Sequence, residues 1–164
     1  MKVFWKRLIA LLLVMGAQVS LMPYLSRSPF YFDLLLVYLF YLGFYFDQVE
    51  AGILGIIGGF LRDSFSHRFF GLSALVYGLA GFLSGFFRRL LVHYPIVAFS
   101  FTVWGGTFSV YFLYYFLLYL FGLQVSLDYL LAFSLGAAFS NFLVAIFVSL
   151  AAFFRRGESI FEES

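Results

Sequence analysis

The stretch that decides the fold runs from Gly52 to Gly85. It reads GILGIIGGFLRD from Gly52 to Asp63, crosses a short polar turn, and resumes as GLSALVYGLAGFLSG from Gly71 to Gly85. Both segments are apolar and rich in glycine, and Asp63 stands at the end of the first. A carboxylate beside membrane-length apolar sequence is costly, so we expect Asp63 to have a defined partner.

The composition places this stretch in a membrane. Of the 164 residues, 64% are hydrophobic and only 11% are charged, and the mean hydropathy is +1.01. Because a spanning helix needs about 20 residues, the chain has room for about six or seven spans and for no extramembrane domain. A soluble enzyme or nucleotide-binding domain is therefore excluded. The net charge of +2 is too small to indicate nucleic acid, and cysteine is absent.

The apolar runs predict an all-α, polytopic membrane protein that forms a single transmembrane domain over residues 1–164. Six transmembrane helices are expected, and the third is short and either extends through Asp63 or is broken. Their approximate ranges are 8–25, 30–46, 49–61, 69–87, 95–121 and 129–154.

Basic residues predict the topology. With six spans and a cytoplasmic N-terminus, seven Lys and Arg residues fall inside and three outside. The inside set is Lys2, Lys6, Arg7, Arg88, Arg89, Arg155 and Arg156, and the outside set is Arg27, Arg62 and Arg68. If the third run did not cross, the count would be five against five. We therefore expect both termini in the cytoplasm, although a re-entrant hairpin of the third and fourth runs would leave this count unchanged.

Two stripes of small residues are predicted on the third and fourth spans. The first recurs every four residues and the second at spacings of 3, 4, 3 and 4, so each follows one face of a helix. The first stripe is Ala51, Gly55, Gly59 and Asp63, and the second is Gly71, Ala74, Gly78, Gly81 and Gly85. Small residues let helices approach closely in lipid, so we expect the stripes to face each other. Internal packing and docking of a separate membrane protein both remain open.

Few polar side chains stand within the predicted spans. Asp63 is expected to be a structural anchor that accepts hydrogen bonds where the chain turns, and Asn141 and Gln18 are expected to bond between helices. The other acids, Asp33, Asp47, Glu50 and Asp128, are placed near loop ends.

No reactive constellation is found among these residues. Asp63 and His67 would supply only two metal ligands, and no nucleophile, base and orienting group can be assembled. We therefore expect no enzyme activity, catalytic residue, cofactor or metal.

The segment from Gly52 to Asp63, followed by FGLSAL at 70–75 and a glycine-spaced helix, resembles the rod shape-determining protein MreD family. The specific part covers about 35 residues, and chain length and the basic start agree over nearly the whole chain. This chain departs from the family in the turn, where Ser66, His67 and Arg68 replace a common Gly, and at Phe70, where Leu is usual.

The resemblance implies a multi-pass protein of the bacterial inner membrane that belongs to the cell-elongation complex and is not an enzyme. It implies the bitopic partner MreC and, through it, the MreB filament and the glycosyltransferase and transpeptidase pair of peptidoglycan synthesis. Membrane lipid is an expected partner, nucleic acid is not, and a homodimer is left open.

The alternative is a substrate-binding membrane subunit of a vitamin transporter, which has a similar six-helix architecture. Those subunits commonly carry an Ala-x-x-x-Ala pattern in the first helix. Here Ala10 and Ala17 are seven residues apart with Val14 between them, which weighs against this alternative.

Overall fold

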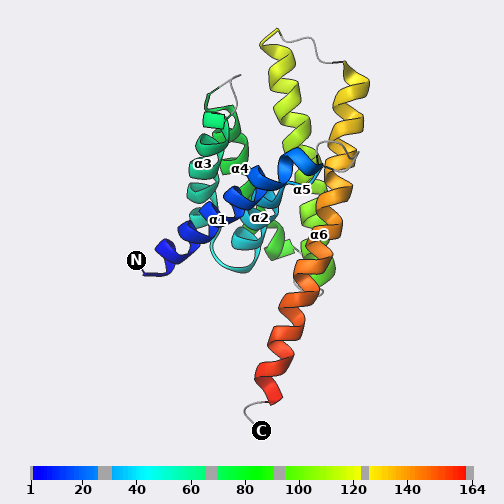
Figure 1. Ribbon diagram of the computed structural model, residues 1–164. Coiled ribbons are helices and arrows are strands. Elements are labelled where there is room, and N and C mark those ends of the chain that lie inside the picture. The colour runs from blue at the N-terminus through cyan, green and yellow to red at the C-terminus, as the bar shows by residue number, and fades with distance from the viewer. Residues whose placement is uncertain (1, 26–30, 66–69, 91–94, 123–125, 162–164) are drawn as a thin grey trace.

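The computed structural model describes residues 2–25, 31–65, 70–90, 95–122 and 126–161 (Figure 1). Every regular element in these ranges is an α-helix, which confirms the predicted fold class. The helices are α1 (Lys2–Leu25), α2 (Leu34–Tyr45), α3 (Gln48–Phe65), α4 (Leu72–Leu90), α5 (Pro95–Leu120) and α6 (Leu127–Phe161).

Three of these helices are long and apolar enough to cross a membrane. The qualifying segments are Val3–Leu21 in α1, Val97–Leu120 in α5 and Leu127–Ala151 in α6. Helices α2 and α4 are shorter apolar helices. Many large apolar side chains remain exposed on the outside of the bundle, such as Phe147 at 75%. Such a surface suits lipid rather than water, so the fold indicates an integral membrane protein.

Helix α2 lies at the centre of the molecule and contacts each of the other five helices. The α3–α4 hairpin packs on one side of it and the α5–α6 hairpin on the other (Figure 1). The sequence of α2, LLLVYLFYLGFY, is apolar on all sides, as expected for a helix that is surrounded by protein. Its side chains Leu35, Leu36, Leu39 and Phe40 are at most 2% exposed.

The central helix is shorter than the predicted span over residues 30–46. It has 12 residues, which corresponds to about 18 Å, against about 30 Å for the hydrocarbon core of a bilayer. It begins only after Asp33, whose side chain caps it. The start of α2 therefore lies inside the protein, where its first backbone N–H groups need protein acceptors.

Helix α3 is continuous over 18 residues from Gln48 to Phe65, or about 27 Å. Of the two alternatives for the third helix, extension through Asp63 is confirmed and a break is wrong, because α3 is uninterrupted. Close packing against α4 stabilises it. A Cβ atom added to Gly55 would lie 2.4 Å from the carbonyl oxygen of Tyr77, and one added to Gly59 would lie 2.3 Å from the Cα of Ala74. Only glycine permits such an approach of two backbones.

At the other end of α3, a charged contact joins it to α1. The Arg7 guanidinium forms an ion pair with Glu50 and lies over the ring of Phe46, 4.3 Å from its centroid. The hydroxyl of Tyr38 donates to the backbone oxygen of Arg7 at 2.9 Å. The start of α1 is thus fixed next to the α2–α3 connection.

Candidate functional site

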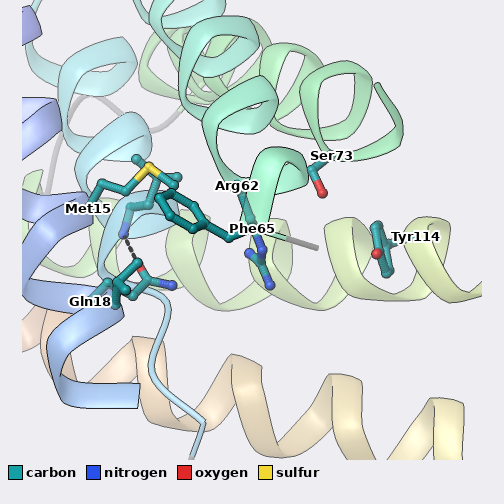
Figure 2. A pocket seen from close by; sticks show the side chains of 8 residues that line it. Met15, Gln18, Arg62, Phe65, Ser73 and Tyr114 are labelled. Carbon is teal, nitrogen blue, oxygen red and sulfur yellow. Dashed lines mark hydrogen bonds between the residues drawn. The ribbon is translucent and has the colours of Figure 1, made fainter. Parts of the chain in front are cut away.

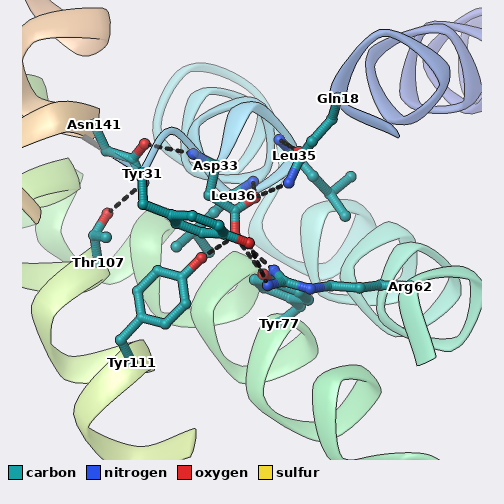
Figure 3. Close-up of polar contacts among 10 residues, drawn as sticks. All are labelled: Gln18, Tyr31, Asp33, Leu35, Leu36, Arg62, Tyr77, Thr107, Tyr111 and Asn141. Carbon is teal, nitrogen blue, oxygen red and sulfur yellow. Dashed lines mark hydrogen bonds and ion pairs between the residues drawn. The ribbon is translucent and has the colours of Figure 1, made fainter. Parts of the chain in front are cut away.

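A buried carboxylate, that of Asp33, organises the interior (Figure 3). Its side chain is fully buried at 0% exposure. The Oδ2 atom accepts hydrogen bonds from Nη1 of Arg62 at 2.7 Å, from the hydroxyl of Tyr111 at 2.6 Å and from the hydroxyl of Tyr77. Nη2 of Arg62 also donates to the hydroxyl of Tyr31 at 3.0 Å. The fully buried carboxylate of Asp33 is thus ion-paired and hydrogen-bonded, as burial of a charge requires.

The second oxygen of Asp33 serves the start of α2. Oδ1 accepts from the backbone N–H of Leu36 at 3.1 Å and from Nε2 of Gln18 at 3.2 Å. Gln18 Oε1 accepts from the N–H of Leu35 at 2.9 Å, and Oδ1 of Asn141 accepts from the N–H of Asp33 at 2.8 Å. The amides that begin this internal helix therefore have side-chain acceptors.

These side chains form one cluster, which we name the Asp33 cluster. It joins the start of α2 to every other helix, with one residue from each. Its members are Gln18 of α1, Asp33, Arg62 of α3, Tyr77 of α4, Tyr111 of α5 and Asn141 of α6. Asn141 is held in turn by Thr107, to whose Oγ1 its Nδ2 donates at 3.3 Å. The cluster thus fixes the relative positions of six helices around Asp33, five through its carboxylate and α6 through its backbone N–H.

Asp33 does stand at the end of a loop, as predicted, because it directly precedes and caps α2, but this loop end lies inside the protein. A second span that starts at residue 30 would put Asp33 near an interface, whereas the residue stands at an internal helix start. The missed signal was an N-cap residue type directly before the uninterrupted apolar run of Leu34–Tyr45. Gln18 and Asn141 lie between helices, in the hydrogen-bonding role expected of them.

Asp63 has a separate place at the α3–α4 junction. It is 2% exposed, and its Oδ2 accepts from the backbone N–H of Gly71 at 2.8 Å and of Ser73 at 3.1 Å. Gly71 has a φ of +97°, a conformation that favours glycine. Asp63 thus caps α4, while the adjacent Arg62 turns to Asp33 instead. His67 of the weighed metal pair, and Arg27 and Arg68 of the topology count, lie outside the described residues.

The stripe of small residues on α4 packs mainly against α3. A Cβ on Gly81 would lie 2.4 Å from the carbonyl oxygen of Ala51, one on Gly78 would meet the side chain of Ile56 at 2.6 Å, and one on Gly85 would meet that of Gln48 at 2.5 Å. Ala74 is 3% exposed. The two predicted stripes do face each other, and their inner sides serve internal packing. Gly71 is the exception, because it precedes α4 in a turn and does not belong to the helical stripe.

A pocket of about 340 Å³ lies beside the Asp33 cluster (Figure 2). It is lined by residues of α1, α2, α3, α4 and α5. They are Met15, Gln18, Val19, Leu35, Arg62, Phe65, Ser73 and Tyr114. The Arg62 side chain, although bonded to Asp33, is 26% exposed. We name this cavity the Arg62 pocket.

A larger, apolar groove of about 590 Å³ follows the outer face of the α3–α4 hairpin. Its lining is almost wholly aliphatic, aromatic or glycine. The residues are Val49, Gly52, Ile53, Ile56, Phe60, Gly71, Ala74, Leu75, Gly78, Leu79 and Phe82. We name it the hairpin groove.

Comparison of the chain with protein-family models, with curated proteins and with solved structures found no match. Function therefore has to be argued from the site itself. In the part of the chain that the structure describes, no group of three or more His, Asp or Glu residues is positioned to hold a metal ion.

Proposed function

We propose that this chain is a non-enzymatic component of the bacterial cell-elongation (rod) complex in the inner membrane. In this role it docks the bitopic protein MreC and so helps to organise lateral peptidoglycan synthesis and to maintain cell shape. The observation that carries the proposal is the α3–α4 hairpin. Residues 52–63 and 70–75, in which the resemblance to the MreD family is found, form the walls of the tightest helix pair and the hairpin groove.

The form of the groove supports docking of a single transmembrane helix. Gly52 and Gly78 lie in its lining, where their lack of a side chain lets α3 and α4 pack closely and deepens the groove between the flanking side chains. The flanking side chains project outward, with Ile53 at 47%, Leu79 at 46% and Phe82 at 45% exposure. In lipid, association of helices depends on the close packing that such a groove allows. The hydrophobic effect does not drive it, because acyl chains are as apolar as the side chains.

The proposed topology has six crossings with both termini in the cytoplasm. The seven-to-three distribution of Lys and Arg residues supports it. In Figure 1, α3 and α5 end on the upper side of the view and α6 runs from that side to the lower end, as alternating crossings of these helices require. Arg7 and Glu50, whose ion pair joins α1 to α3, fall on the same cytoplasmic side in this topology.

Co-purification with MreC in mild detergent tests the proposal. Ile53→Trp and Leu79→Trp would fill the groove with side chains that start from exposed positions, and both are expected to reduce partner recovery at least several-fold. Leu143→Trp on α6 is the matched control, because Leu143 has a similar 46% exposure away from the groove. Equal protein levels in the three variants would show that folding is unaffected.

Two results would contradict the proposal. One is full recovery of MreC, and full restoration of rod shape in cells that lack their own MreD, by both groove variants. The other is retention of a small vitamin-like molecule without any bitopic partner, which would favour the transporter alternative.

A further inference from the structure

We propose that the Arg62 pocket binds a phosphate group, and that the phosphate is carried by a lipid. This inference goes beyond the proposed docking function and does not depend on it, because the described residues that line the pocket and those that line the hairpin groove are different. It rests on an excess of hydrogen-bond donors in a cavity that is otherwise apolar.

The first step is the balance of donors around Asp33. Its two oxygens accept five hydrogen bonds, three at Oδ2 and two at Oδ1, whereas a carboxylate offers about four lone-pair positions. The carboxylate is therefore saturated. Arg62 donates one N–H to Asp33 and one to Tyr31. A guanidinium carries about five N–H donors. The exposed part of Arg62 thus brings further donors into the pocket, while its charge is balanced by Asp33.

The rest of the lining adds donors and few acceptors. The side chains of Ser73 and Tyr114 contribute hydroxyl groups on the same side of Arg62 (Figure 2). Oε1 of Gln18 already accepts from the N–H of Leu35, and the lining residues that the structure describes include no carboxylate. A ligand for this pocket must bring acceptors. Phosphate brings several acceptor oxygens, and arginine recognises it through paired N–H groups.

The apolar part of the lining indicates that the phosphate belongs to a lipid. Met15, Val19, Leu35 and Phe65 surround the donors, and Phe65 is 66% exposed. A free inorganic phosphate would leave these side chains without contacts. A phosphate at the head of an acyl-chain lipid would place its charge on Arg62 and its glycerol and first methylene groups against them.

Native mass spectrometry of the full-length protein in a neutral detergent tests the proposal. The probes are phosphatidic acid, diacylglycerol with the same acyl chains, and inorganic phosphate. The first two differ only in the phosphate, so we expect at least tenfold tighter binding of phosphatidic acid than of diacylglycerol. Equal binding of the two lipids would overturn the phosphate site. Binding of inorganic phosphate as tight as that of phosphatidic acid would overturn the lipid as its carrier.

A matched pair of double variants locates the site. Ser73→Ala with Tyr114→Phe removes two pocket hydroxyls and leaves the members of the Asp33 cluster unchanged. Since a hydrogen bond to a charged group contributes enough for about tenfold in affinity, this variant should bind phosphatidic acid at least tenfold more weakly. Ser109→Ala with Tyr119→Phe makes the same chemical changes outside the pocket and should bind like the parent protein. Equal affinity of the two double variants would overturn the assignment to this pocket.

Discussion

Two buried aspartates define this molecule at the scale of single residues, and they hold different things together. Asp63 satisfies the first amides of α4 within one hairpin. Asp33 combines the same capping task with an ion pair and two tyrosine hydroxyls from distant parts of the chain. Loss of Asp33 should therefore affect the whole fold, whereas loss of Asp63 should affect mainly the α3–α4 junction.

Asp33→Ala is expected to lower the free energy of unfolding by about 3–5 kcal/mol, because it leaves a buried guanidinium without its partner. Asp47→Ala is the control. Asp47 caps α3 by accepting from the N–H of Val49 and of Glu50 at an exposed position, so its loss should cost about 1 kcal/mol. Thermal unfolding in detergent, followed by loss of the monodisperse protein, compares the two variants. Similar melting temperatures would show that the Asp33 cluster does not stabilise the fold.

Substitutions of Asp63 distinguish an anchor from a titrating transport group. Asp63→Asn retains an acceptor oxygen for the amides of Gly71 and Ser73, so it should be milder than Asp63→Leu, which leaves both amides unpaired. Protein level, recovery of the partner and cell width are the measurements. Complete loss of function in both variants, with normal protein level and intact partner binding, would point to a proton or ion role instead.

At the scale of elements, the glycines of the α3–α4 hairpin are not equivalent. Gly59→Ala and Gly81→Ala would drive a Cβ into backbone atoms at 2.3 Å and 2.4 Å, so both should strongly reduce the accumulated protein. Gly105→Ala is the control, because nothing lies within 4 Å of its added Cβ, and alanine favours a helix by about 1 kcal/mol over glycine. Its level should equal or exceed that of the parent protein. Normal accumulation of Gly59→Ala and Gly81→Ala would contradict this packing of α3 on α4.

The same hairpin shows what could be predicted from the sequence. A helix repeats every 3.6 residues, so the spacing of Gly55, Gly59, Gly78 and Gly81 is enough to identify packed faces. The Asp33 cluster has no such signature. Its members are up to 123 residues apart, from Gln18 to Asn141, and only the tertiary arrangement brings them together. Asp33 before the apolar run marks the start of α2, but its buried position could not be predicted, since hydropathy does not show whether a run starts at an interface or inside the protein.

At the scale of the whole molecule, the topology can be tested directly. Reporter fusions after Ser126 and at Ser164 should place the first outside and the second in the cytoplasm, because α5 would cross outward and α6 back again. A reporter that is active only in the periplasm, fused at Ser164, should therefore stay inactive. Activity at that position would contradict an even number of crossings.

The hydrogen bond from the backbone N–H of Asp33 to Oδ1 of Asn141 can form only late in biosynthesis. The ribosome makes α2 long before α6, so a nascent chain carries the start of its central helix with an unmatched amide until nearly the end of translation. Chains that stop before Asn141 keep that defect permanently. A truncated copy therefore differs from a finished one both by an unpaired amide at the centre of the molecule and by the lost packing of α6 on α5.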